Sequence, residues 1–264
     1  MRTQASDRLR RYRRYAAAAA NVLRRDGPVA LARRLYRKAT GGPVIKPPPP
    51  QRFRLASARR PLVFPVFERV AVSFIVLARG GCRHTFTTLE SILSQAEVVA
   101  CEVLVVEAGD QETRKMLGSV RGIRVLPGRE RGPARTAHEA AGLARGDFLV
   151  FLRDGMVLTR GWARCMLDTF RRDPAIGLAG PQIVSERGMI LSAGGQTGGD
   201  GVPSERGRGK NPCGHSEYNY LRAASYCAPA CLMLPRSLYG HAGGVDGSPA
   251  IARVQAAELA RSIQ

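Results

Sequence analysis

The chain has 264 residues, 44% of them hydrophobic and 23% charged, which is the balance of a soluble globular protein with a substantial core. No apolar run approaches the ~18 residues that a membrane-spanning helix needs. The net charge of +20 is uneven, because residues 1–60 hold 17 Lys or Arg against two Asp, whereas residues 61–264 hold 24 basic against 19 acidic residues. The basic character therefore belongs mainly to an N-terminal arm.

This arm predicts a basic helical extension over residues 1–46. Residues 7–25 repeat apolar side chains at helical spacing behind a cluster of arginines, a second short helix starts at Pro28, and the run 47–50 consists of four prolines. We therefore expect a Pro-rich linker over residues 47–69. The first helix has two interpretations, which are docking onto an anionic membrane and docking onto a partner protein.

Localisation and partners of the arm follow from the same residues. Because the basic start leads into no signal-peptide core with a cleavage site, we expect a cytoplasmic protein, and peripheral contact with the inner membrane face stays open. A nucleic-acid partner is disfavoured, since no aromatic stacking residues accompany the arginines. An alternative interpretation of the arginine content is a composition bias of the genome.

From residue 70 onward, short β-rich runs alternate with helical segments, which predicts an α/β fold with a mainly parallel sheet over residues 70–264. Strands are predicted at 70–77, 102–106, 123–126, 148–152 and 226–234, with helices between the first four and after the fourth. Ligands bind beyond the carboxyl ends of such strands, so function is expected in the loops after 77, 106 and 152. The glycine-rich stretch 174–246 is interpreted as a binding loop or a disordered one.

Several segments, in order and spacing, resemble family 2 glycosyltransferases, particularly those that build bacterial surface polysaccharides. These segments are 72–77 (VSFIVL), 88–93 (TLESIL), 102–110 (EVLVVEAGD), 146–152 (GDFLVFL), 161–162 (GW), 173–174 (DP), 193–195 (AGG), 226–236 (YCAPACLMLPR) and 243–246 (GGVD). The resemblance covers roughly residues 70–260. It implies a GT-A fold, in which helices flank a mixed, mainly parallel sheet, and transfer of a sugar with inversion from a nucleoside-diphosphate sugar to a glycan or glycolipid acceptor.

The resemblance also implies a nucleotide site made of Ala78 and Arg79 after the first strand, Glu107 after the second, and Arg153 and Asp154 after the fourth. The family commonly has Asp-x-Asp at the last place, where a divalent cation, Mg²⁺ or Mn²⁺, bridges the diphosphate. Here Asp154 remains as the metal candidate. Arg153 has two interpretations: it pairs with a phosphate in metal-independent transfer, or it neutralises Asp154.

The catalytic base that the resemblance implies would lie in a Glu-Asp-x-Asp-Leu segment, where this chain has 255–259 (QAAEL). Glu258 is the acid left in that segment, and Asp246 is the alternative candidate. Losses at three functional places leave two hypotheses open, an inverting glycosyltransferase and an inactive pseudoenzyme that acts as a binding or scaffold module. It also stays open whether the chain is a truncated copy of a longer protein.

Overall fold

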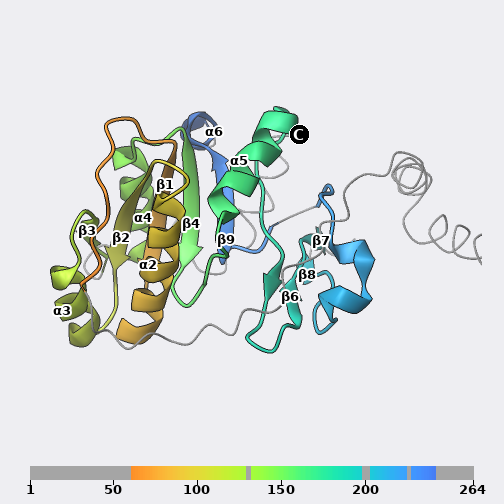
Figure 1. Cartoon of the computed structure of the whole chain (residues 1–264), viewed down its shortest axis with the longest axis horizontal. Coiled ribbons are helices and arrows are strands. Elements are labelled where there is room, and N and C mark those ends of the chain that lie inside the picture. The colour runs from red at the N-terminus through yellow and green to blue at the C-terminus, as the bar shows by residue number, and fades with distance from the viewer. Residues whose placement is uncertain (1–60, 129–131, 198–202, 225–226, 242–264) are drawn as a thin grey trace, which may run out of the picture. The chain divides into compact units, whose positions relative to one another are not determined.

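The computed structural model describes residues 61–128, 132–197, 203–224 and 227–241 (Figure 1). The predicted helical extension over 1–46, the first part of the linker and the candidate bases Asp246 and Glu258 lie outside the described residues. None of the described helices is long and apolar enough to cross a membrane.

A five-stranded sheet forms the centre of the described region. Its order is β3-β2-β1-β4-β9, and the first four strands run parallel while β9 is antiparallel to β4 (Figure 1). The strands are β1 (Val72–Ala78), β2 (Cys101–Glu107), β3 (Arg124–Pro127), β4 (Phe148–Arg153) and β9 (Cys231–Pro235). The predicted mixed and mainly parallel sheet is confirmed.

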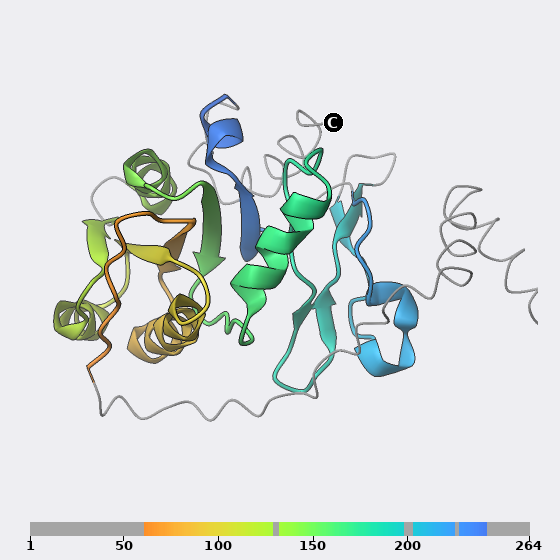
Figure 2. The same cartoon turned by 45° about the horizontal axis from the view of Figure 1, so that its top comes forward.

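Helices cover both faces of this sheet. One face packs against α2 (Cys82–Ala96), α3 (Gln111–Ser119) and α5 (Trp162–Arg172), and the other against α4 (Pro133–Leu143) and α6 (Arg236–His241). Figure 2 shows α2, in gold, and α4, in green, on opposite sides of the strands. Successive side chains of β1 point to opposite faces of the sheet, so each face has its own hydrophobic core. Phe74 faces the first set of helices and Ile75 the second, and both are fully buried.

The last strand is shorter than the sequence predicts. β9 begins at Cys231, not at residue 226, because Pro229 has no N–H to donate to a ladder. The chain turns there instead, and the Cys231 N–H donates to the Ala228 carbonyl at 3.3 Å. Only after this turn does β9 pair with β4, from Cys231 opposite Leu152 to Pro235 opposite Phe148.

The glycine-rich stretch contains regular structure that its sequence does not predict. Two small antiparallel sheets pair β5 (Ile183–Val184) with β6 (Ile190–Ser192) and β7 (Gly195–Thr197) with β8 (Pro203–Glu205), and 3₁₀ turns follow at Pro212–Gly214 and Ser216–Tyr218. Gly194 and Gly207 adopt left-handed φ values of 79° and 74°, which ordinary residues avoid. The interpretation of the stretch 174–246 as a disordered loop is therefore wrong for the residues of these strands and turns.

Residues 61–64 pack against the domain, although the sequence places them in the predicted linker. Leu62 and Phe64 are buried in the core. The Phe64 N–H donates to the Arg121 carbonyl, and the Arg121 N–H donates to the Leu62 carbonyl, both at 2.9 Å. This short stretch is thereby fixed beside the turn that precedes β3.

Gly122 in that turn permits the contact, so Gly122→Ala is expected to lower the free energy of unfolding by about 2 kcal/mol. Its φ is +77°, and an added Cβ would overlap the Phe64 carbonyl oxygen. The control is Gly118→Ala in α3, where a Cβ meets nothing within 4 Å and is expected to add up to about 1 kcal/mol. Urea unfolding measures both, and equal effects of the two substitutions would contradict the packing of residues 61–64.

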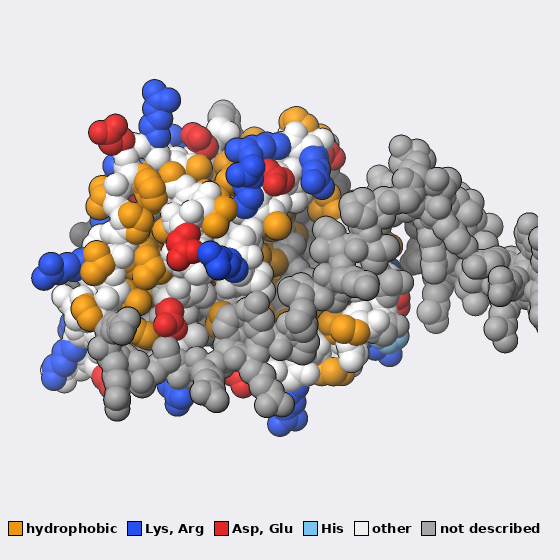
Figure 3. Space-filling view, in the orientation of Figure 1, with side chains coloured by type: hydrophobic (Ala, Val, Ile, Leu, Met, Phe, Trp, Pro, Cys, Tyr) orange, Lys and Arg blue, Asp and Glu red, His pale blue; other side chains and the backbone are white. Residues whose placement is uncertain are grey.

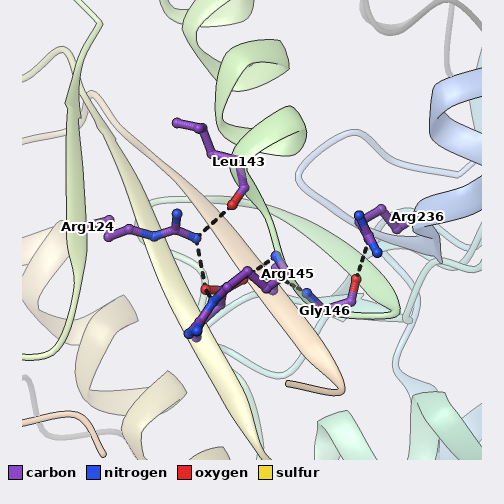
Figure 4. Close-up of polar contacts among 7 residues, drawn as sticks. Arg124, Leu143, Arg145, Gly146 and Arg236 are labelled. Atoms are coloured by element: carbon purple, nitrogen blue, oxygen red, sulfur yellow. Dashed lines mark hydrogen bonds and ion pairs between the residues drawn. The ribbon is translucent and has the colours of Figure 1, made fainter. Parts of the chain in front are cut away.

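A buried carboxylate, Glu102, connects neighbouring strands at the amino-terminal edge of the sheet. Glu102 Oε1 accepts hydrogen bonds from Ser73 Oγ and from the Arg145 backbone N–H, both at 2.6 Å. Its Oε2 accepts from Arg124 at 2.8 Å and from Arg145 Nε at 3.1 Å (Figure 4). Burial alone raises the pKa of Glu102, but the hydrogen bonds from Ser73 and Arg145 and the charge of Arg124 outweigh it, so that the pKa is lowered.

The network around Glu102 extends to the backbone of its neighbours. Arg124 also donates to the Leu143 carbonyl at 3.0 Å, and Arg236 Nε donates to the Gly146 carbonyl at 2.9 Å (Figure 4). Together with the hydrogen bonds of Glu102, they connect β1, β2 and β3 with the end of α4, the loop before β4 and the start of α6. The polar groups at this edge satisfy one another, which makes it a structural edge and leaves the carboxyl-terminal edge for a ligand.

Candidate functional site

The carboxyl ends of three neighbouring strands lie in register. Ala78 at the end of β1 is the Cα partner of Glu107 at the end of β2, and Leu77 is the partner of Arg153 at the end of β4. Three of the predicted site residues therefore come from adjacent strands at one edge of the sheet. The loops after 77, 106 and 152, in which function is expected, therefore start at the same edge of the sheet.

Asp154 holds the loop between β1 and α2. Its Oδ2 accepts hydrogen bonds from the backbone N–H groups of Arg79 at 2.8 Å and Gly80 at 2.5 Å, and from Thr85 Oγ1 at 3.2 Å. The Asp154 N–H in turn donates to the Leu77 carbonyl at 3.3 Å. The carboxylate thus satisfies backbone donors that precede the first turn of α2, much as a capping residue does.

The loop residue Gly80 lies directly against this carboxylate. A Cβ at Gly80 would come within 3.2 Å of Asp154 Oδ2 and 3.3 Å of Oδ1, so both oxygens face the loop. The Gly80 carbonyl is also within 2.8 Å of His84 Nδ1. A side chain at position 80 would push the carboxylate away from its donors.

The loop after β4 is fixed by hydroxyl groups of α2. Thr88 Oγ1 accepts from the Gly155 N–H at 2.9 Å and donates to the Met156 carbonyl at 2.8 Å. Ser91 Oγ accepts from the Leu158 N–H at 3.1 Å. The sequence analysis does not single out these residues or Thr85. The signal that could have found them is the run of Ser and Thr among the apolar residues of this helix.

Glu107 is buried at the end of β2, where its carboxylate lies beside α3. Its Oε2 forms an ion pair with Arg114 Nε at 3.3 Å. The backbone is fixed as well, because the Gly128 N–H donates to the Glu107 carbonyl at 2.7 Å. The carboxylate of Glu107, a member of the predicted nucleotide site, is therefore held in a defined position at the edge.

Arg79 and Arg153 are exposed at this edge, and their backbones are anchored. The Arg153 N–H donates to the Ala230 carbonyl at 2.9 Å, and its carbonyl accepts from the Met156 N–H at 3.3 Å. Across the described ranges, neither guanidinium forms an ion pair, and Arg153 does not pair with Asp154. The interpretation that Arg153 neutralises Asp154 is therefore not supported by a contact.

Residues 87–211 match the model of the glycosyl transferase family 2. Over these residues the chain is similar to that family. It includes α2, the ends of β2 and β4 and the loop after β4, and so it carries Glu107, Arg153 and Asp154. A search of curated proteins finds no match to the chain.

A solved mannosyltransferase shares the fold of this domain. The mannosyltransferase PcManGT from Pyrobaculum calidifontis, in complex with GDP-Man and Mn²⁺, is 15% identical with a TM-score of 0.51, and the match covers 94% of this chain and 62% of that one. TarS 1–349 from S. aureus is 15% identical with a TM-score of 0.46, covering 72% of this chain and 55% of that one.

A third structure is mannosyl-3-phosphoglycerate synthase from Rubrobacter xylanophilus, at 15% identity and a TM-score of 0.44, covering 64% of this chain and 55% of that one. The chain thus spans between about half and two thirds of the length of these proteins. The architecture of this domain is that of the GT-A fold, as the sequence analysis predicts.

One carboxylate oxygen of Asp154, the residue expected to hold a metal, is already occupied by donors of the protein. Within the described part of the chain, no group of three or more His, Cys, Asp or Glu side chains could hold a metal ion. A cation that bound Asp154 Oδ2 would have to displace donors from Arg79, Gly80 and Thr85. The arrangement therefore supports a loop-positioning role for Asp154.

Proposed function

We propose that the chain binds a nucleoside-diphosphate sugar at the carboxyl edge of β1, β2 and β4 and transfers the sugar to a glycan or glycolipid acceptor. The observation that carries this proposal is the meeting of Ala78, Glu107 and Arg153 at one edge of a domain similar to family 2 glycosyltransferases. Exposed arginines at the edge suit a diphosphate, and the buried Glu107 suits the hydrogen-bond donors of a nucleotide base.

The transfer needs two kinds of group. The bond between sugar C1 and the diphosphate oxygen breaks with its electron pair moving to the diphosphate, which positive charge at the edge stabilises. The acceptor oxygen forms the new bond to C1 from the opposite side, and its proton passes to a carboxylate base. Glu258 and Asp246 are the proposed bases, and the basic arm is proposed to bring the domain to an anionic surface or a partner protein.

Nucleotide binding tests this proposal directly. The full chain is titrated calorimetrically with UDP, GDP and dTDP in the presence of Mn²⁺, and at least one is expected to bind with a Kd on the order of 1–100 μM. GDP is included because the Pyrobaculum mannosyltransferase is in complex with GDP-Man.

Glu107→Gln, which keeps the shape but removes the charge, is expected to weaken that binding about tenfold. Glu97→Gln is the matched control, because Glu97 is exposed at the end of α2 and pairs with Arg160. Failure of all three nucleotides to bind would contradict the proposal. Binding without release of sugar from the corresponding donor, in the presence or absence of acceptors, would instead favour the pseudoenzyme.

A further inference from the structure

We propose that the site holds the diphosphate of its nucleotide without a divalent cation, with the guanidinium groups of Arg153 and Arg79 supplying the positive charge. This inference rests on the proposed function, and concerns how the same site recognises its ligand. It departs from the expectation that Asp154 is a metal ligand.

The first step is the orientation of Asp154. Three donors converge on its Oδ2, and both carboxylate oxygens lie against Gly80. A metal ligand at this place would need to present an oxygen to the diphosphate, away from the loop. Oδ2 of this carboxylate instead accepts from the backbone of Arg79 and Gly80 and so fixes the loop.

The second step is the availability of positive charge. Several arginines of the described residues are paired with a carboxylate; such pairs are Arg114 with Glu107, Arg124 and Arg145 with Glu102, Arg135 with Glu139, Arg160 with Glu97, and Arg164 and Arg171 with Asp168. Arg79 and Arg153 are exposed and have no such partner in the ranges that the structure describes. Their charge is available to an anion at the edge.

The third step is the placement of these two arginines. Asp154 binds the Arg79 N–H directly, while Arg153 is the residue before Asp154 and is anchored by hydrogen bonds of its backbone to Ala230 and Met156. Asp154 therefore fixes the backbone of Arg79, while the backbone of Arg153 is fixed by Ala230 and Met156. A guanidinium offers paired N–H donors that match phosphate oxygens, so two of them can replace the charge of a divalent cation.

The charged side chains on one face of the molecule are mixed in sign. On the face shown in Figure 3, Lys and Arg side chains are scattered and interleaved with Asp and Glu, and do not gather into one basic patch. Loss of a single arginine at the edge is therefore expected to weaken anion binding directly, because no large basic patch on this face compensates for it.

The test titrates UDP, GDP and dTDP into the full chain in EDTA and, separately, in Mn²⁺. The nucleotide that binds is expected to do so with affinities within about twofold of each other in the two buffers. Arg153→Ala is expected to weaken binding in EDTA at least tenfold and Arg79→Ala about threefold to fivefold, with Arg153→Lys between wild type and Arg153→Ala because a point charge remains.

The matched control is Arg172→Ala. Arg172 is exposed at the end of α5, two residues after Phe170, whose ring packs against Phe148 at the amino-terminal end of β4. It lies away from the edge and is expected to leave affinity unchanged.

The outcomes separate this inference from the proposed function. Binding that needs Mn²⁺, or that Arg153→Ala does not weaken, would overturn the metal-free site and leave the proposed function standing. Binding in neither buffer would overturn both.

Discussion

Glu102→Ala is expected to lower the free energy of unfolding by about 3 kcal/mol, since it removes the shared acceptor of a buried network. Its carboxylate accepts from Ser73, the Arg145 backbone and the side chains of Arg124 and Arg145. The two arginine side chains are about half exposed, so water partly compensates them and the loss stays near the lower end for buried ion pairs. Urea unfolding followed by circular dichroism measures the effect.

Glu97→Ala provides the comparison. Glu97 pairs with Arg160 at 3.0 Å, but both side chains are largely exposed, so we expect a change below about 0.5 kcal/mol. If the two alanine variants lose the same stability, Glu102 is not the structural centre of the amino-terminal edge.

The same residue gives the unfolding free energy a defined pH dependence. Because the folded-state pKa of Glu102 lies below its ordinary value, its ionised form favours the folded protein above the unfolded pKa, and this contribution is lost as pH falls through the folded pKa. The stability difference between wild type and Glu102→Gln is therefore expected to be constant from pH 7 to about 5 and to shrink below about pH 4. A difference that grows on acidification would show the opposite linkage.

Asp154→Ala is expected to lower the free energy of unfolding by about 2 kcal/mol, because backbone donors of Arg79 and Gly80 and the hydroxyl of Thr85 lose their acceptor. Amide hydrogen exchange at Arg79 and Gly80 is expected to accelerate, whereas exchange in β2 stays slow. Chemical unfolding and exchange mass spectrometry measure the two effects.

A metal ligand would behave differently at this position. A carboxylate that serves as a metal ligand repels neighbouring negative charges when the metal is absent. Its removal therefore usually leaves the free energy of unfolding unchanged or raises it in metal-free buffer. The control Asp168→Ala removes an exposed carboxylate that bridges Arg164 and Arg171, with an expected effect below about 1 kcal/mol. Unchanged or increased stability of Asp154→Ala would contradict its role in holding the loop.

The central sheet could be predicted because its residues carry a local signal. Apolar runs in β1 and β2 are continuous, as expected for strands that are buried on both faces. Asp110 has the residue type that sequence patterns favour just before a helix, and its carboxylate accepts from the Thr113 N–H of α3 at 2.8 Å. Both features depend on residues that are close in sequence.

The role of Asp154 could not be predicted in the same way. Its partners Arg79, Gly80 and Thr85 lie 69 to 75 residues earlier in the chain. The resemblance places Asp154 where the family commonly has an Asp-x-Asp motif, which implies a metal site. It contains no information on which atoms would face the carboxylate. The network around Glu102 was missed for the same reason. Glu102 lies inside β2, and its partners Ser73, Arg124 and Arg145 lie in β1, in β3 and in the loop before β4.

The small sheets of the glycine-rich stretch were missed for a different reason. Strands of two or three residues, such as β5 and β7, are too short for any periodicity. They are held by long-range contacts instead, including the hydrogen bonds of Gln182 Nε2 to the Tyr218 carbonyl at 3.0 Å and to Asn219 Oδ1 at 3.2 Å.

The most direct test of a nucleotide site at the carboxyl edge is hydrogen exchange of the full chain with and without the nucleotide that binds most tightly. Protection is predicted in the loops at 78–81, 107–110 and 153–156, with no change at the opposite edge around Arg145 and Gly146. Protection confined to other segments, or none at saturating nucleotide, would contradict the account.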